Sequence, residues 1–261
     1  MLDSFFVGKR MNTLMFCCLM LAMTIIAIVI TEFDVIKGLT SIPKATEWAV
    51  TNFYPNEKSL TRLPVIISSL VETVLVSIAA TTVAAMFALM FALAGSQTTG
   101  TGGALSFISR SIATIFRNID VAAWSMILLI SFGQNVLTGY LALFFGSFGF
   151  LTRSFMETID EVSSSSVDAL RSTGASYFTI IFQSVIPSCV PQLISWILFM
   201  METNIRQATL IGILTGTGIG FLFSLYYKSL NFNAASLIVL VLVITIFAIE
   251  LVSNYVRKVI L

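Results

Sequence analysis

Four charged side chains lie within or beside the long apolar stretches of this sequence: Glu72, Glu202, Arg206 and Glu250. A charge inside a lipid bilayer is costly, and such residues usually face the interior of a helix bundle or a water-filled path. They could therefore form a translocation pathway or a gate, in which Arg206 would meet an oxyanion. The structural alternative is that they fix helix register, because Glu202 and Arg206 are four residues apart and would pair on one helix. Three carboxylates would also repel an anion unless they are paired.

Histidine, which many catalytic and metal sites use, is missing from the sequence. Cys17, Cys18 and Cys189 follow no disulfide or zinc spacing. No GxxxxGK[S/T] phosphate-binding loop occurs, and the stretch "GTGIG" lacks the lysine. We therefore predict that the chain is not an enzyme and holds no metal or cofactor. Its net charge of +1 gives no reason to expect a nucleic-acid partner.

The composition places the chain in a membrane. Apolar residues make up 57% of its 261 residues and charged residues only 10%, whereas soluble domains carry about 25% charged residues. Several runs approach the ~20 apolar residues that a transmembrane helix needs. The first run, 11–31, follows Lys9 and Arg10 as in a signal peptide, but it is too long for a signal core and no small-x-small cleavage site follows. We interpret it as a retained span.

We predict an all-α polytopic membrane protein with about six transmembrane helices, at residues 11–30, 63–94, 112–132, 138–155, 187–201 and 234–252. Residues 1–62 would form an N-terminal transmembrane helix and an external loop, broken by Pro43 and Pro55. Residues 63–261 would form the core, with a cytoplasmic loop at 157–186. The glycine-rich stretch "GSQTTGTGGALS" (95–106) would be a flexible connector.

The uncharged segment 208–227 allows two interpretations. Its glycines could form a small-residue packing face on a spanning helix, or they could break the segment so that it does not cross the membrane. We favour the second, because both termini then face the cytoplasm. Basic residues are in excess on that side, as the positive-inside rule requires. These are Lys9, Arg10, Arg110, Arg117, Arg153, Arg171, Arg257 and Lys258.

The stretch "SVDALRSTGASYFTIIFQSVIP" (166–187) is a polar interruption between two apolar runs. The serines before it offer helix caps, with Ser165 and Asp168 at capping-box spacing, and Gly174 falls where a helix would end. Pro187 suits the first turn of the next span. We expect a short helix, a glycine bend and a second helix at the cytoplasmic surface. Its presented residues would be Val167, Asp168, Leu170, Arg171 and Tyr177. An ordinary interfacial linker is the alternative.

This stretch resembles the cytoplasmic "EAA" loop of ABC-importer permeases, whose pattern is Glu-Ala-Ala, three residues, Gly, nine residues, Ile-x-Leu-Pro. Aligned on Gly174, the chain has Asp168, Ala169 and Leu170 for the first three, and Ser184, Ile186 and Pro187 for the last. Asp168 keeps the carboxylate, whereas Leu170 and Ser184 depart from the pattern. The resemblance implies that residues 168–174 form the coupling helix, which docks on an ATPase subunit.

A second resemblance is to the phosphonate-type branch of these permeases. The stretch "METNIRQATLIGILTGTGIG" (201–220) is similar to that branch's Glu-x-Asn-Ile-Arg-x-Ala-Thr segment and the glycine-rich segment after it. The residues that match the first segment are Glu202, Asn204, Ile205, Arg206, Ala208 and Thr209. Thr215 and Thr217 stand where the branch has glycine, and Asp120 replaces its usual proline but could cap a helix. Methionine-type permeases have a similar glycine-rich segment.

The resemblance implies the type I ABC-importer permease fold and a function. The chain would move a small oxyanion of the phosphonate, phosphite or phosphate class across the bacterial cytoplasmic membrane, driven by a separate ATPase that binds the ATP. The implied partners are an ATPase dimer, an extracytoplasmic binding protein that sets selectivity, a second permease copy or sister permease, and membrane lipid. The coupling residues would be Val167, Asp168, Ala169, Leu170, Arg171, Gly174 and Pro187, and the candidate pathway residues Glu72, Glu202, Asn204 and Arg206.

Two alternatives stay open. The permease could carry another small solute, such as an amino acid in the manner of methionine-type permeases. The chain could instead be an ion- or proton-coupled secondary transporter, in which Glu72, Glu202 and Glu250 would relay protons. Such transporters usually contain inverted repeats, and the sequence has no convincing internal repeat.

Overall fold

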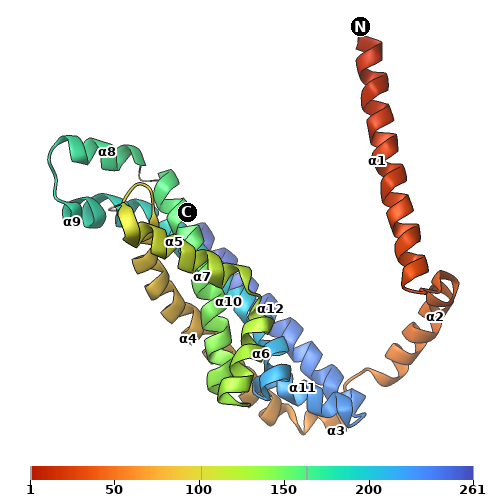
Figure 1. The fold of residues 1–261 in the computed structure, drawn as a ribbon. Coiled ribbons are helices and arrows are strands. Elements are labelled where there is room, and N and C mark those ends of the chain that lie inside the picture. The colour runs from red at the N-terminus through yellow and green to blue at the C-terminus, as the bar shows by residue number, and fades with distance from the viewer. Residues whose placement is uncertain (1, 101, 163, 261) are drawn as a thin grey trace. The chain divides into compact units, whose positions relative to one another are not determined.

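A computed structural model of the chain describes residues 2–100, 102–162 and 164–260, with the side chains of these residues except 2–9, 164 and 260. The described residues form helices joined by short turns and contain no strand, which confirms the all-α prediction (Figure 1). They divide into two compact units, residues 1–54 and 55–261. The sequence analysis places this boundary at residue 62, whereas the structure places it after residue 54. The short helix α3 (Glu57–Leu60) belongs to the second unit, because it packs against α12 (Phe232–Ile260).

The first unit contains α1 (Leu2–Ile30) and α2 (Val35–Asn52). From Arg10 to Ile30 α1 is long and apolar enough to cross a membrane. The expected loop after it is wrong for residues 35–52, which are helical. Asp34 caps α2 by accepting a hydrogen bond from the Lys37 backbone N–H at 2.9 Å, and Pro43 lies inside this helix instead of breaking it.

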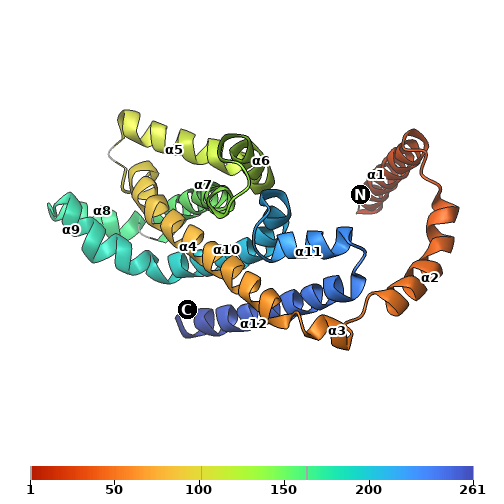
Figure 2. The same cartoon turned by 90° about the horizontal axis from the view of Figure 1, so that it is seen from below.

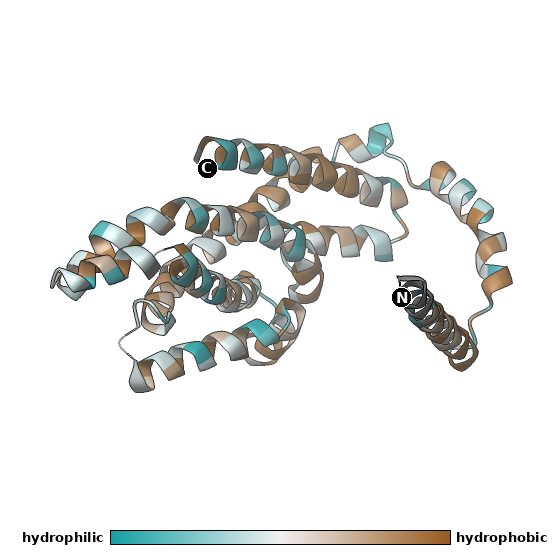
Figure 3. Ribbon diagram, turned by 90° about the horizontal axis from the view of Figure 1, so that it is seen from above, coloured by the Kyte–Doolittle hydropathy of each residue, from teal (hydrophilic) through white to brown (hydrophobic). Residues whose placement is uncertain are grey.

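The second unit holds the remaining spans around one central helix. Its long apolar helices are α4 (Leu63–Gly95), α7 (Val136–Val162), α12 and a continuous helix from Tyr177 to Thr215. Together with α1 these are five candidate spans among the described residues, or six if α5 (Gly103–Asn118) and α6 (Val121–Phe132) count as one. α7 packs against α4, α5, α6 and α10 (Ile186–Thr215) (Figure 2). The prediction of about six spans is confirmed, and α12 is apolar along most of its length (Figure 3).

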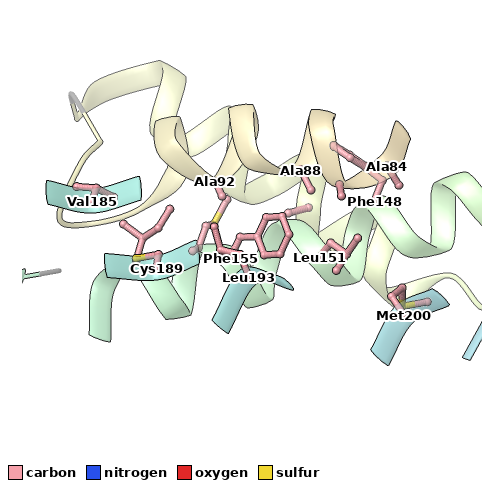
Figure 4. Close-up of a cluster of buried hydrophobic side chains, with 14 of the residues drawn as sticks. Ala84, Ala88, Ala92, Phe148, Leu151, Phe155, Val185, Cys189, Leu193 and Met200 are labelled. Carbon is pink, nitrogen blue, oxygen red and sulfur yellow. The ribbon is translucent and has the colours of Figure 1, made fainter. Parts of the chain in front are cut away.

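α4 meets α7 along a stripe of small side chains. The stripe recurs every three or four residues, which is one face of a helix, and it consists of Ala80, Ala84, Ala88, Ala92 and Gly95, all buried. Figure 4 shows Ala84, Ala88 and Ala92 facing Phe148, Leu151 and Phe155 of α7. Because lipid is as apolar as leucine, close packing of small residues is what draws membrane helices together.

The expected span 112–132 is wrong as a single straight helix. α5 and α6 meet at an angle of 92°, and α6 begins at Asp120, whose carboxylate accepts a hydrogen bond from the Ala122 N–H at 2.8 Å. This confirms Asp120 as a helix cap. Three aromatic rings hold the corner: Phe116 stacks on Trp124 at 5.1 Å, and Trp124 contacts Phe145 of α7 at 4.8 Å between centroids.

The segment 208–227 does not cross the membrane as one helix. α10 extends to Thr215, well beyond the predicted end at 201, and ends at Gly216 in the left-handed conformation. α11 (Gly218–Lys228) has 11 residues, or about 16 Å, which is too short for the ~30 Å hydrocarbon core. α11 packs on α10 so closely that a side-chain carbon on Gly220 would overlap the Thr209 carbonyl oxygen. The structure confirms that the segment is broken, and that it does not cross the membrane stays a prediction.

We predict that Gly220→Ala destabilises the protein, because a backbone carbonyl cannot move aside for the new methyl group. Overpacking of this kind costs about 1–3 kcal/mol. Gly139→Ala is the control, since its methyl would meet the Thr215 hydroxyl at an ordinary 3.5 Å. Melting in detergent should be several degrees lower for Gly220→Ala than for Gly139→Ala. Equal melting temperatures would contradict the close approach of α10 and α11.

Candidate functional site

The polar insertion forms a helical hairpin at one end of the second unit (Figure 1). α8 (Ser164–Ser172) ends in a Schellman motif, in which the Ala175 N–H bonds the Leu170 carbonyl at 3.2 Å and the Gly174 N–H bonds the Arg171 carbonyl at 3.0 Å. Gly174 has φ +77°, which only glycine adopts without strain. The predicted glycine bend is therefore confirmed.

The helix cap predicted at the start of this hairpin is not where the spacing suggested. α8 already includes Ser164, so Ser165 and Asp168 lie within the helix instead of at its start. The first serine of the run, Ser163, lies outside the described residues.

The prediction of which side chains α8 presents is partly wrong. Val167 is fully buried and Leu170 half-buried, and both pack against the core that includes Ile159, Ile180 and Val185. The outward face is formed by Asp168, Ala169 and Arg171, which are exposed. A helix of nine residues has two faces, and the sequence alone did not settle which one faces the rest of the protein. Val167 is an anchor of the hairpin and not part of its outer surface.

The second half of the hairpin presents aromatic side chains. α9 (Tyr177–Ile180) is capped by Ser176, which accepts a hydrogen bond from the Thr179 N–H at 3.3 Å. Tyr177 is exposed as predicted, and Phe178 and Phe182 are more exposed, at 71% and 64%. The last two were missed as surface residues, although their spacing of four residues places them on one helix face.

α9 continues into α10 without a break. A π-helical turn (Ile181–Val185) joins them, and the Ile186 N–H bonds the Ile181 carbonyl five residues back. Pro187 lies in the first turn of α10, as predicted. The wider π-turn just before it relieves the crowding that a proline causes. The result is one helix of 39 residues.

Asn204 lies where α4, α7 and α10 meet. It is fully buried, and its Nδ2 donates to the Thr81 hydroxyl at 2.7 Å and to the Ser147 hydroxyl at 2.6 Å. These hydroxyls in turn donate to carbonyls of their own helices, Thr81 to Ser77 and Ser147 to Leu143. One amide therefore fixes the register of three helices.

Glu202 and Arg206 pair as the four-residue spacing predicted, at 2.8 Å. The second partner of Glu202 was not predicted: Arg257 of α12 approaches its other carboxylate oxygen at 3.6 Å. Glu202 is 9% exposed, so its charge is balanced within the protein. Two guanidinium groups around one carboxylate leave this cluster with a net positive charge. The sequence places Arg257 only among the basic residues near the C-terminal end.

Arg206 also borders a groove. The groove has a volume of about 340 Å³ and lies between the start of α6 and α10, where Asp120, Gln207 and Leu210 line it with Arg206. The Arg206 side chain is 45% exposed. It is the most exposed member of the charged cluster, since the Arg257 side chain is 28% exposed.

Glu72 is not part of this cluster. It is half-buried and lines a separate cavity of about 20 Å³, large enough for about one water molecule. Its neighbour Thr73 accepts a hydrogen bond from the Ile219 N–H at 3.0 Å, which fastens α11 to α4. Glu72 lies nine residues before Thr81, or about 13 Å along α4. Glu250 is exposed on α12, so the three carboxylates considered for a proton relay are not gathered together.

Comparison with known proteins gives consistent results. Residues 84–260 match the family described as "Binding-protein-dependent transport system inner membrane component". The phosphate-import permease of Mycolicibacterium smegmatis is 26% identical over 187 residues, which are 72% of this chain and 35% of that longer protein. A putative phosphite transport system permease of Stutzerimonas stutzeri is 27% identical over 98% of this chain and 89% of its own length.

Solved structures show the same fold. The chain is similar to a subunit in a crystal structure of an amino acid ABC transporter with histidines, with a TM-score of 0.65, 14% identity and coverage of 76% of this chain and 95% of that one. It is similar also to a chain of the inward-facing methionine ABC transporter, with a TM-score of 0.62, 18% identity and coverage of 75% and 97%.

We predict that Asn204 and Ser147 stabilise the bundle together. Asn204→Leu and Ser147→Ala should each destabilise the protein, and a double-mutant cycle should give a coupling energy of about 0.6 kcal/mol, the average for hydrogen bonds between membrane helices, and at most about 1.7 kcal/mol. Unfolding in mixed micelles measures it. The control is Thr203→Ala, whose hydroxyl bonds only Phe199 of its own helix and should show no coupling to Ser147. Additive effects of Asn204→Leu and Ser147→Ala would contradict the assigned hydrogen bond.

Proposed function

The chain belongs to the family of binding-protein-dependent transport system inner membrane components, and on that premise we propose that its α8–α9 hairpin is the element through which an ATPase drives transport. The family match and the relatives identify an ABC-importer permease of the phosphonate type. It is a multi-pass subunit of the inner membrane and not an enzyme. What it carries and how it is driven are the proposal.

The observation that carries the proposal is the construction of the hairpin. It lies at one end of the unit, its outer face is polar and aromatic, and its inner face is fixed by Val167. The 39-residue helix that leaves it measures about 58 Å and exceeds the ~30 Å of a bilayer core. The hairpin therefore extends beyond the apolar layer, where a soluble partner can reach it.

The proposed mechanism follows from these connections. ATP binding closes the dimer of a separate ATPase, which displaces α8. Val167 and the continuous α9–α10 helix pass the displacement to Asn204 and Glu202, at the junction of α10 with α4, α7 and α12. The spans then shift between two arrangements, whose populations the ATPase sets. One copy supplies part of a pathway, so we include a second copy or a sister permease, together with an external binding protein.

For the substrate we propose a small oxyanion of the phosphonate, phosphite or phosphate class. The names of the relatives support this class. The charged cluster is compatible with it, because Glu202 is neutralised by Arg206 and Arg257 and no longer repels an anion. Arg206 is the residue that would meet the anion, since it borders the groove beside α6. Methionine-type transport is the second candidate, because a methionine import permease of Bacillus subtilis is 27% identical over 60% of this chain.

We predict that uptake by reconstituted importer depends on ATP, the ATPase and the binding protein. Vesicles that contain the assembled complex should take up labelled phosphite or phosphonate, and methionine should not compete. Vesicles with the permease alone and an imposed proton or sodium gradient are the control. Uptake by these control vesicles would establish an ion-coupled transporter and contradict the proposal, and competition by methionine would contradict the substrate class.

We predict that Gly174→Leu separates ATP hydrolysis from transport. The site has open space around it, but a side chain at φ +77° costs roughly 1–2 kcal/mol, so the bend between α8 and α9 should change. Uptake per ATP hydrolysed should fall, while membrane insertion stays normal.

Gly133→Leu is the control for backbone strain, because Gly133 has equally open surroundings and ends α6, away from the hairpin, with φ +73° and ψ −173°, a conformation at least as unfavourable for a side chain. It should leave the ratio of uptake to hydrolysis unchanged. Unchanged coupling in Gly174→Leu would count against the role of the hairpin.

A further inference from the structure

The turn between α4 and α5 is a fixed structure and not the flexible connector that its glycines suggested. Ser96 and Thr99 are almost fully buried, at 1% and 2% exposure. The Ser96 hydroxyl accepts a hydrogen bond from the Thr99 N–H at 3.2 Å, and the Thr99 hydroxyl donates to the Leu93 carbonyl at 2.8 Å. The prediction of flexibility was wrong for residues 96–100, and residue 101 lies outside the described part.

One carboxylate accepts hydrogen bonds from this turn, although it lies more than 60 residues further along the sequence. Asp160, near the end of α7, accepts a hydrogen bond from the Ser96 hydroxyl at 2.6 Å and another from the Thr98 N–H at 2.9 Å. Hydrogen bonds to a charged acceptor are shorter and stronger than neutral ones. Asp160 forms no ion pair among the described residues, so its charge is balanced by these donors.

The same turn is bound from the opposite side by α8. The Arg171 Nη2 donates to the Thr98 carbonyl at 2.7 Å, and Figure 1 shows this turn beside the α8–α9 hairpin. The peptide groups of Thr98 therefore connect the end of α7 to α8, since the N–H bonds Asp160 and the carbonyl accepts from Arg171. Arg110 of α5 completes the attachment by donating from Nε to the Gly95 carbonyl at 2.6 Å.

We propose that Asp160 is a positioning residue that makes the α4–α5 turn a second attachment of α8. The inference rests on the proposed role of α8 as the coupling helix. Val167 joins α8 to the core and to α10, whereas Arg171, Thr98 and Asp160 join it to the ends of α4, α5 and α7. A displacement of α8 then reaches both sides of the bundle at once. Asp160 holds Thr98 where Arg171 can reach it and need not touch the ATPase itself.

The decisive experiment compares Asp160→Ala with Glu161→Ala in the complete importer. Glu161 is the neighbouring carboxylate, is exposed and forms no ion pair among the described residues. Asp160→Ala should lower uptake per ATP hydrolysed by about fivefold or more, the lower end of usual coupling energies, while hydrolysis continues. Asp160→Asn keeps one oxygen acceptor and should restore part of the ratio. Glu161→Ala should leave the ratio unchanged.

A second measurement tests whether the α4–α5 turn transmits the displacement of α8 or is only ordered by Asp160. Arg171→Ala removes a surface side chain and should fold normally. It should also lower the uptake per ATP hydrolysed. The double variant with Asp160→Ala should be no worse than the more impaired single variant. Hydrogen exchange at residues 96–100 should speed up in Asp160→Ala. Faster exchange with an unchanged ratio, or additive losses in the double variant, would overturn the inference.

Failure of this inference is distinguishable from failure of the proposed function. If Gly174→Leu uncouples the importer and Asp160→Ala does not, α8 is the coupling helix but the turn is not its second attachment. If neither variant changes the ratio, the role of α8 itself is wrong. Should Asp160→Ala not assemble, Ser96→Ala, which removes one donor to the same carboxylate, gives the same test.

Discussion

The close contact of α4, α7 and α10 is the constraint on which the rest of the second unit depends. Lipid offers no hydrophobic gain when two helices meet, so contact requires small residues and a few hydrogen bonds. The alanine stripe of α4 supplies the first, and Asn204 supplies the second by bonding Thr81 and Ser147. Once these helices are held in register, α11 can fold back against α10, and the α5–α6 corner can rest on α7 through Phe116, Trp124 and Phe145.

This arrangement connects a polar end of the protein to charged residues inside it. The hairpin residues Asp168 and Ala169 are exposed, whereas Val167 is buried in the same core that α10 lines. The uninterrupted helix from Tyr177 to Thr215 then passes Glu202, whose carboxylate is shared with Arg206 and Arg257. In the proposed function, a partner that displaces the hairpin acts on the first turns of this helix, and the charged cluster lies further along the same helix. Glu202 would not repel the proposed anionic substrate, because Arg206 and Arg257 neutralise its charge.

Local chemistry in the sequence predicted the backbone correctly at three positions, although it failed at Pro43 and Ser165. Gly174 ends a helix, Asp120 starts one, and Pro187 lies in a first turn, each as its side chain requires. The sequence could not settle which face of α8 is buried. That face packs against Ile159 of α7 and Val185 of the π-helical turn, and only the fold sets their position relative to α8. Asp160 and Arg257 were missed for the same reason: their partners, Ser96 and Glu202, are more than 50 residues away. The family resemblance pointed to Asn204, but its three-helix contact appears only in the fold.

The central claim is that the outer face of α8 contacts the ATPase. A photo-reactive amino acid at Ala169, in the assembled importer, tests it most directly, because Ala169 is exposed and lies beside Asp168. The same amino acid at Leu230, 73% exposed in the turn between α11 and α12, serves as the reference. We predict a crosslink to the ATPase from position 169 and none from 230. Absence of an ATPase adduct from 169 in a complex that still transports would contradict it.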